Sequence, residues 1–303
     1  PAPIFFSNSR FCGGSALETL YRWSKFIEGD RLDEWENRFI AEGIFYVLEK
    51  AEKNLRWLIS VYTPSSEEAD DLLTRFGGTI DPLAPAQWQP SPGSGEEMLL
   101  RVRDTLLVTG SEDAAVIRRL SDEHPGRIVL SFPPQLAFGT GSHPTTAGCL
   151  RFLSDFAKTR RGLPWSVLDL GCGSGILAIA AAKLGATRVV AVENDALALI
   201  YARENAGRHG VADVVDFVEG DAIALMAAEA EQPYDLIAAN LFSDLLEVLF
   251  PRFPVHLAPD GELIVSGFLA AQAASVSSHA EAAGLPLVAT MRRGKWMAGR
   301  APR

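Results

Sequence analysis

An alternation of short apolar runs with helical segments most constrains the fold; it begins near residue 127 and continues to the C-terminus. Strands that alternate with helices of about ten to fifteen residues are typical of parallel strands joined by crossover helices. We therefore predict a doubly wound α/β domain built on a mostly parallel sheet. Ligands of such domains bind outside the carboxyl ends of the strands. The strands expected here are 128–132, 167–170, 188–192, 214–218, 235–239 and 262–266, followed by a terminal hairpin over 287–299.

The first third of the chain has a different pattern of apolar residues. Apolar residues between 15 and 53 recur at helical spacing, with a break at Gly29, and predict helices. The next segment has the pattern strand, helix, strand, in which Ser65 or Ser66 caps a helix that ends before Gly77. A proline-rich loop follows. We therefore divide the chain into a helical segment over 1–53, a small α+β domain over 54–110, a linker over 111–134 and the large domain over 135–303.

Charge and cysteine usage narrow the class of protein. The 28 basic and 38 acidic residues leave a net charge of −10, so the chain is a poor non-specific binder of nucleic acid and suits a basic partner. Three cysteines without a CxxC pair argue for a reducing compartment. The apolar run over 176–182 is far shorter than the ~18 residues of a membrane span, and no HExxH metal motif occurs. These features predict a soluble cytoplasmic protein that binds neither membranes nor nucleic acid directly.

The strongest local motif is a glycine-rich loop, DLGCGSG over 169–175, between a predicted strand and a predicted helix. Glycines allow a tight turn and a close approach of the backbone to a ligand, and the helix adds its aligned amide dipoles. Gly171, Gly173 and Gly175 form G-x-G-x-G, whereas a dinucleotide-binding loop has G-x-G-x-x-G. We predict that Asp169 and the three glycines line a cofactor.

Three further polar residues follow predicted strands. Glu193 lies 18 residues after Gly175 at a strand end, where a carboxylate can accept both hydroxyls of a ribose. Asp221 could bond an adenine amino group or could simply be a turn residue. Asn240 ends an apolar strand and offers one acceptor and two donors, or it could cap the next helix.

A loop of turn-forming and hydroxyl residues, AFGTGSHPTT over 137–146, precedes the large domain's first strand. Its Gly-Thr-Gly segment could close over a bound cofactor. The alternative is an ordinary linker with a helix cap at Thr145. His143 within this loop is, by residue type, a candidate general base.

In this order, the glycine loop, Glu193, Asp221 and Asn240 resemble the class I methyltransferases that use S-adenosylmethionine. The loop over 137–146 and NLFS over 240–243 resemble the PrmA family, which methylates amino groups of the eleventh protein of the large ribosomal subunit. GKW over 294–296 is similar to the closing GEW of that family. The resemblance implies a seven-stranded Rossmann-like methyltransferase sheet, S-adenosyl-L-methionine as cofactor, no metal, and substrate recognition by the small N-terminal domain.

The resemblance also implies roles for individual residues. Asn240 would position the reacting groups, and His143 is the candidate base. Glu193 stands where the family usually has Asp, and the longer side chain can serve the ribose in the same way. The residues implied to contact the cofactor are Phe138, Thr140, Thr146, Asp169, Gly171, Gly173, Gly175, Glu193, Asp221 and Asn240.

Other segments depart from the family pattern. Pro133, Pro134 and Gln135 stand where the family has Asp-Pro-Gly. The first 53 residues have no recognisable counterpart, and the α+β pattern over 54–110 is shorter than the family's ferredoxin-like unit. These departures concern the choice of substrate rather than the cofactor.

The resulting prediction is methyl transfer from S-adenosylmethionine to lysine or other amino groups of a basic ribosomal protein of the large subunit. The sulfonium is already a strong methyl donor, so the enzyme chiefly aligns donor and acceptor. The acceptor lysine must first lose a proton from an ammonium whose pKa is ~10.4. Three alternatives stay open: the same chemistry on another protein or a small molecule, a nicotinamide-dependent dehydrogenase, and a non-catalytic binding module.

Overall fold

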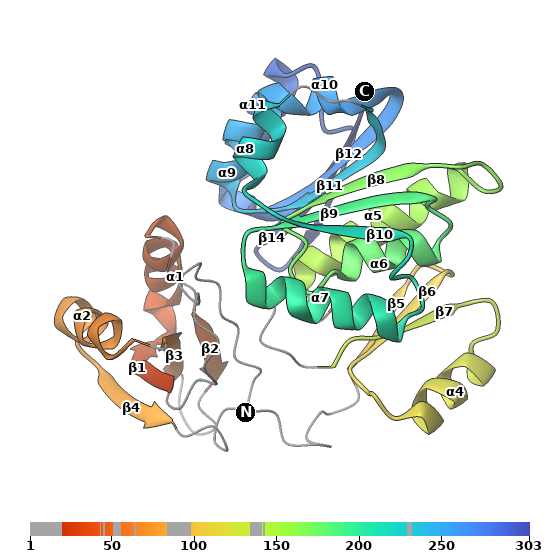
Figure 1. Cartoon of the computed structure of the whole chain (residues 1–303). Coiled ribbons are helices and arrows are strands. Elements are labelled where there is room, and N and C mark those ends of the chain that lie inside the picture. Colours follow the sequence, from red (N-terminus) through yellow and green to blue (C-terminus); the bar gives the residue numbers. More distant parts are fainter. Residues whose placement is uncertain are drawn as a thin grey trace. The chain divides into compact units, whose positions relative to one another are not determined.

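The computed structural model describes residues 20–42, 44, 46–50, 56–63, 65–83, 98–133, 141, 143–228 and 232–303. Internal contacts divide the chain into two compact units, and each is described by itself (Figure 1). Unit 1 comprises Pro1–Ser94 and Pro134–Phe138, and unit 2 comprises Gly95–Pro133 and Gly139–Arg303.

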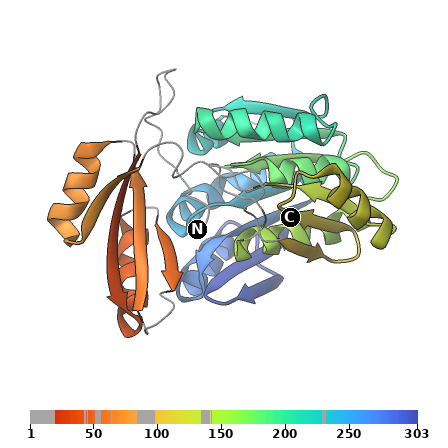
Figure 2. The same ribbon diagram turned by 90° about the horizontal axis from the view of Figure 1, so that it is seen from below.

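Unit 1 has the element order β-α-β-β-α-β, which is the order of a ferredoxin-like unit. Its four strands form one antiparallel sheet in the order β2-β3-β1-β4 (Figure 2). Trp23, Trp35, Phe39 and Phe76 form an aromatic core between the sheet and the helices, with ring centroids of Phe39 and Phe76 5.0 Å apart. The elements are β1 (Leu20–Glu28), α1 (Leu32–Ala41), β2 (Val47–Lys50), β3 (Arg56–Thr63), α2 (Ser66–Phe76) and β4 (Thr79–Leu83).

Strand β1 corrects the predicted helical segment over 1–53, of which only the short 3-10 helix Gly29–Arg31 and α1 are helical among the described residues. Trp23 and Ile27 are buried on one face of β1, whereas Phe26 between them is 59% exposed. The apolar residues of this stretch fit both periods, and pairing with β3 and β4 selects the period of two. The small unit is therefore a complete ferredoxin-like unit and not the shortened one that we predicted.

Helix α2 begins and ends as its sequence predicts. The Ser65 side chain caps the helix by accepting a hydrogen bond from the Glu68 amide, and Gly77 ends it with a φ of +65°. Gly78, with a φ of +97°, is required as well, because a Cβ there would lie 2.5 Å from the Ser24 carbonyl oxygen.

Unit 2 is built on a mostly parallel seven-stranded sheet, as predicted, and its strand order is β10-β9-β8-β11-β12-β14-β13. The first five strands in this order are parallel, and β14 runs antiparallel to both β12 and β13, which confirms the terminal hairpin. The strands are β8 (Ser166–Leu170), β9 (Arg188–Glu193), β10 (Val215–Glu219), β11 (Tyr234–Asn240), β12 (Leu257–Leu269), β13 (Ala289–Arg293) and β14 (Trp296–Pro302).

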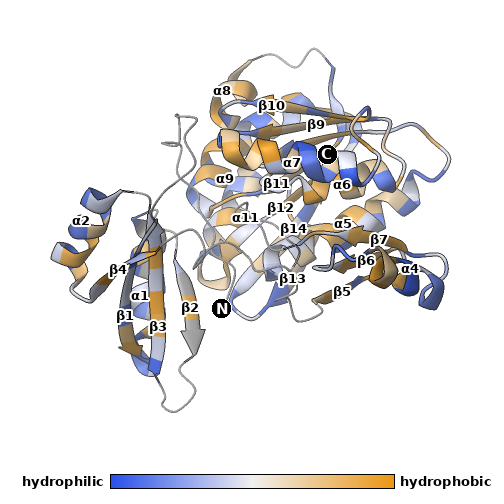
Figure 3. Ribbon diagram, turned by 60° about the horizontal axis from the view of Figure 1, so that its bottom comes forward, coloured by the Kyte–Doolittle hydropathy of each residue, from blue (hydrophilic) through white to orange (hydrophobic). Residues whose placement is uncertain are grey.

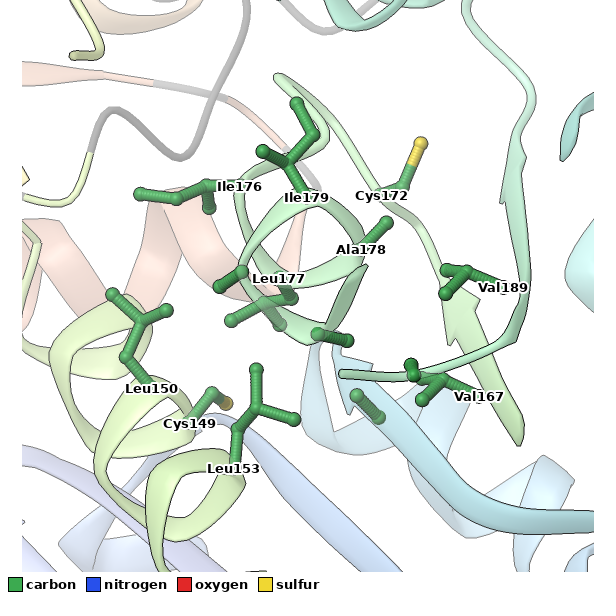
Figure 4. Close-up of a cluster of buried hydrophobic side chains, with 14 of the residues drawn as sticks. Cys149, Leu150, Leu153, Val167, Cys172, Ile176, Leu177, Ala178, Ile179 and Val189 are labelled. Carbon is green, nitrogen blue, oxygen red and sulfur yellow. The ribbon is translucent and has the colours of Figure 1, made fainter. Parts of the chain in front are cut away.

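Helices cover both faces of this sheet, so its central strands are apolar on both sides (Figure 3). One core lies under α5, α6 and α7, where Leu150, Leu153 and Leu177 pack toward Val167 of β8 (Figure 4). The second core lies under the remaining helices, on the opposite face. The helices are α5 (Pro144–Thr159), α6 (Ile176–Lys183), α7 (Ala196–Arg208), α8 (Ala222–Ala227), α9 (Ser243–Leu249), α10 (Phe253–His256) and α11 (Ala273–Ala282).

A second, three-stranded sheet belongs to unit 2 and differs from the predicted organisation. It consists of β5 (Leu99–Val102), β6 (Leu106–Thr109) and β7 (Ile128–Ser131), with α4 (Ala114–Glu123) between β6 and β7. Its buried side chains, including Leu106 and Val108, join the core under α5. The segment 111–134 is thus a helix and a strand rather than a linker, and 128–132 does not join the large sheet. Within the described residues, no helix is long and apolar enough to cross a membrane.

Candidate active site

The carboxyl ends of β8, β9 and β11 meet at one edge of the large sheet. The strand order reverses between β8 and β11, and doubly wound sheets bind ligands at such a reversal. Asp169, Glu193 and Asn240 occupy the last or the next-to-last positions of these three strands. The structure therefore brings together the strand-end residues that the sequence singles out.

The three glycines of the loop between β8 and α6 all have left-handed backbones. Gly171, Gly173 and Gly175 have φ values of +69°, +53° and +79°, which side chains other than that of glycine rarely adopt. A Cβ on Gly175 would lie 3.2 Å from the Ala202 side chain and 3.3 Å from Phe217. The third glycine thus permits close packing of α6.

Asp169, on β8, is completely buried, and its side chain caps the N-terminus of α6. Its Oδ2 accepts a hydrogen bond from the Ala178 amide at 3.0 Å, in the first turn of α6, where Gly175 at the N-cap has no side chain to do so. Its Oδ1 is buried without a hydrogen-bond partner. Burial raises the pKa of Asp169, the hydrogen bond from Ala178 opposes this effect, and the nearby Glu193 carboxylate adds to it, so that the pKa is about 7.

Glu193 holds the glycine loop through its carboxylate. Its Oε2 accepts a hydrogen bond from the Gly173 amide at 2.9 Å, and its Oε1 accepts from the Asn194 and Asp195 amides at 2.9 and 3.1 Å. A carboxylate has about four acceptor positions, so capacity for a ribose hydroxyl remains. The residue thus ties the loop after β8 to the loop after β9.

Two further buried oxygen atoms among the described residues of unit 2 lack hydrogen-bond partners: Thr146 Oγ1 in the first turn of α5 and Asn240 Oδ1 at the end of β11. Cys149 lies one turn after Thr146 in α5. Burial raises the pKa of its thiol, and the nearby Asp169 charge raises it too, whereas a hydrogen bond with Ser266 acts in the opposite direction. Cys149 is therefore close to both Asp169 and Ser266. Ser266 is the register partner of Asn240. Buried polar atoms are nearly always hydrogen-bonded, so these oxygens, with that of Asp169, mark a place for a polar ligand.

His143 has a structural task that the sequence did not show. It is the N-cap of α5, and its Nδ1 lies 2.6 Å from the Thr145 hydroxyl oxygen. Its ring meets the ring of Trp296 edge to face at 4.8 Å. Burial lowers the pKa of His143 to about 4, and the Lys295 ammonium adds to this effect. The imidazole is therefore neutral near pH 7 and weakly basic.

Comparison with known proteins identifies the family. The family model described as ribosomal protein L11 methyltransferase (PrmA) matches residues 101–302. The ribosomal protein L11 methyltransferase of Allorhizobium ampelinum is 35% identical over 258 residues, which cover 82% of this chain and 86% of that protein. The chain belongs to the ribosomal protein L11 methyltransferase family.

Other relatives agree with this assignment. The ribosomal protein L11 methyltransferase of Pelotomaculum thermopropionicum is 41% identical over 173 residues, or 57% of this chain and 54% of that protein. The crystal structure of the ribosomal protein L11 methylase from Lactobacillus delbrueckii subsp. bulgaricus has a TM-score of 0.55 and 27% identity, and the match covers 68% of this chain and 98% of that one. Family and fold together make this chain an S-adenosylmethionine-dependent methyltransferase.

The residues at the sheet edge fit the cofactor of this methyltransferase family. Asp169 Oδ1, Asn240 Oδ1 and Thr146 Oγ1 are buried acceptors without partners, which suits a ligand that carries an ammonium group and ribose hydroxyls. The glycine loop leaves room for close approach of a ligand to the backbone.

The structure does not place three of the predicted cofactor contacts, Asp221, Phe138 and Thr140, at the site. Asp221 caps α8 by accepting a hydrogen bond from the Ala224 amide at 2.8 Å, so the turn role left open by the sequence is present. Its contact with adenine stays a prediction. Phe138 and Thr140 lie outside the described residues.

Sequence reasoning missed Gly267 in this methyltransferase. It follows Ser266 in β12 with a φ of +96°, and a Cβ there would lie 2.2 Å from the Leu241 carbonyl oxygen. Gly267 therefore permits the backbone after Asn240 to pass close to β12. A glycine inside an apolar strand was the available signal. Among the described residues, no cluster of His, Cys, Asp and Glu could hold a metal ion.

Proposed function

We propose that this methyltransferase transfers methyl groups from S-adenosylmethionine to amino groups of ribosomal protein L11, a basic protein of the large ribosomal subunit. The observation that carries the proposal is the combination of membership in the family with a sheet edge where three buried acceptors lack partners. The relative from Allorhizobium ampelinum, which bears the name ribosomal protein L11 methyltransferase, matches 82% of the chain.

On the cofactor side, the glycine loop and Glu193 bind and orient. The Glu193 carboxylate accepts ribose hydroxyls while it holds the Gly173 amide. Asp169 Oδ1 and Thr146 Oγ1, both buried without partners, would accept hydrogen bonds from the polar end of the cofactor. When bound, S-adenosylmethionine supplies an electrophilic methyl group on a sulfonium. Alignment of that methyl group with the acceptor amine lowers the activation barrier by several kcal/mol; well-oriented reactions gain up to ~7–11 kcal/mol in this way.

On the acceptor side, the amine must lose its proton before it attacks. His143, with a pKa of about 4 and its Nδ1 at the Thr145 hydroxyl, does not suit the role of the proton acceptor. Exclusion of water and a largely apolar surrounding disfavour the ammonium form, so the proton leaves to solvent as the substrate docks. The Asn240 Oδ1 accepts an N–H of the neutral amine and orients its lone pair.

The ferredoxin-like unit 1 selects the protein substrate in this proposal. The supporting observation is the separation of features: all the described cofactor-site residues belong to unit 2, while unit 1 has its own sheet and its own aromatic core. We also propose that the enzyme acts in the cytoplasm, where Cys149 and Cys172 stay reduced; both are free thiols and buried.

Methyl transfer from labelled S-adenosylmethionine into a lysate whose cells lack this enzyme tests the proposal. The expected result is one dominant labelled protein that mass spectrometry identifies as ribosomal protein L11. Label in a different protein or in a small molecule, with L11 present and unlabelled, would contradict it.

A further inference from the structure

A groove of about 260 Å³ in unit 2 runs between α5 and the β13–β14 hairpin, outside the cofactor site. Three arginines line it: Arg151 from α5 and the adjacent Arg292 and Arg293 from β13. Met291 and Trp296 contribute apolar surface. The helix and the hairpin are neighbours in the views of unit 2 in Figures 1 and 3. At Gly148, which also lines the groove, α5 packs directly on β14, because a Cβ there would lie 2.7 Å from the Ala298 Cβ.

The three arginines form no ion pair with any described acidic residue. Arg151 donates to the Ala147 carbonyl at 3.2 Å, and Arg292 donates through Nε to the Gly294 carbonyl at 2.9 Å, so most of their N–H groups remain available. Asp155, one turn after Arg151, is instead bound by Arg103 at 2.6 Å. Positive charge therefore accumulates in one groove of a chain whose net charge is −10.

The electrostatics of Arg151 agree with this arrangement. Burial lowers the pKa of its guanidinium, and the charges of Arg293 and Arg103 lower it further. A site in which guanidinium groups repel one another is relieved by an anion. Planar guanidinium groups bind carboxylates through paired N–H donors.

The Trp296 side chain connects the groove to the candidate active site. Trp296 lines the groove and also meets the ring of His143, the cap of α5, at 4.8 Å. Thr146, with its partnerless Oγ1, lies in the same first turn of α5 as the groove residue Pro144. A ligand in the groove would therefore lie beside the N-terminus of α5, the helix that carries Thr146 of the proposed cofactor site.

Size and charge decide between the possible anions. Pockets for small-molecule ligands usually measure about 300–1,000 Å³, so this groove suits one side chain rather than a nucleotide. The acidic surface of the chain also repels an extended polyanion such as RNA. We infer that the groove binds an aspartate or glutamate side chain of the protein substrate and so fixes the register in which the substrate enters the active site. This inference rests on the proposed function for the identity of that substrate.

Steady-state methylation of recombinant ribosomal protein L11 tests the inference with the variants Arg293→Glu and Arg151→Gln/Arg293→Gln. We expect each to raise KM at least about tenfold, which corresponds to ~1.4 kcal/mol, with kcat within about twofold and unchanged affinity for S-adenosylmethionine. Arg118→Glu, on the exposed surface of α4, is the matched control with the same change of charge. Equal melting temperatures verify folding. An unchanged KM in both variants would overturn the inference.

A direct binding experiment separates this inference from the proposed function. Calorimetry with a short glutamate-containing peptide, its glutamine counterpart and a ten-nucleotide single-stranded RNA needs no methyl transfer. We expect the wild-type chain to bind the glutamate peptide alone, and Arg293→Glu to lose that binding. Binding of the RNA in place of the peptide, or equal binding of both peptides, would overturn the inference even if L11 is methylated.

Discussion

At the scale of single residues, the site is held together by carboxylates that have two tasks each. Asp169 caps α6 with one oxygen and leaves the other without a partner. Glu193 holds the Gly173 amide and retains capacity for a ribose. These contacts tie the affinity for the cofactor to the order of the loop, and they lead to two predictions.

The first prediction concerns pH and Asp169. Its pKa is raised to about 7 in the folded chain, so near pH 5 the folded state keeps a proton that the unfolded aspartate has released. Folding is therefore favoured at low pH by this group, and the contribution is lost as the pH rises toward 7. Between pH 5 and 7 we expect wild-type stability to fall by about 2 kcal/mol relative to Asp169→Asn.

Urea unfolding of the cofactor-free chain at both pH values measures this difference. Asp216→Asn, which removes an exposed carboxylate on β10, is the control and should keep the wild-type slope. A parallel pH dependence of wild type and Asp169→Asn would mean that the buried carboxyl does not titrate in this range.

The second prediction concerns Glu193. Glu193→Ala should weaken S-adenosylmethionine and S-adenosylhomocysteine by the same factor, because the ribose is common to both. Charge-assisted hydrogen bonds contribute ~1.5–3 kcal/mol, which corresponds to about 10- to 150-fold in Kd. Calorimetry with both ligands measures the factors. Glu219→Ala, at the exposed register partner on β10, should leave both affinities unchanged. A Glu193→Ala chain that distinguishes the two ligands speaks against a ribose contact.

At the scale of elements, the glycine loop combines a ligand-facing part with a packing part. Gly173 and Gly175 both have left-handed backbones, so alanine at either position costs about 1–3 kcal/mol of stability. The Cβ direction of Gly175 is filled by Ala202 and Phe217, whereas Gly173 donates its amide to Glu193, the residue proposed to hold the ribose. We expect Gly173→Ala to lose cofactor affinity at least about tenfold and Gly175→Ala to keep it within about threefold. Thermal melts and calorimetry on both variants decide this, and equal losses of affinity would refute the division.

The elements also show what sequence periodicity can predict. The strand–helix alternation after residue 160 and the strand-end positions of Asp169, Glu193 and Asn240 were predictable, because parallel strands are continuous apolar runs. Residues 20–28 were not, since their aromatic side chains fit helical spacing until sheet partners select alternation. The contacts of Glu193 with the Gly173 amide and of Asp169 with α6 depend on spatial neighbours that no local pattern encodes.

At the scale of the whole molecule, the cofactor site and the ferredoxin-like sheet belong to different units. The boundary near Gly95 makes a truncation informative. A chain that starts at Gly95 retains β5 and β6, whose Leu106, Leu107 and Val108 are fully buried. A chain that starts at Arg127 lacks them, and each lost apolar side chain is worth ~1.5–3 kcal/mol.

We therefore expect the Gly95 chain to melt cooperatively and to bind S-adenosylmethionine like the full chain, and the Arg127 chain to be insoluble or unfolded. The Gly95 chain should methylate ribosomal protein L11 at least about 100-fold less efficiently in kcat/KM, a loss of ~2.7 kcal/mol. Circular dichroism, calorimetry and labelled methyl transfer provide the three readings. A soluble Gly95 chain that methylates L11 at the full rate would show that unit 1 does not select the substrate.

We propose that the sheet edge around Asn240 carries out the transfer of methyl groups to amino groups of ribosomal protein L11. Intact-mass measurement of L11 after incubation with S-adenosylmethionine and either the wild-type chain or Asn240→Ala tests it most directly. We expect added methyl groups with the wild-type chain and at least about 100-fold slower addition with Asn240→Ala, a loss of ~2.7 kcal/mol of transition-state stabilisation. An unmodified L11 with a wild-type chain that binds the cofactor, or equal rates for both chains, would contradict it.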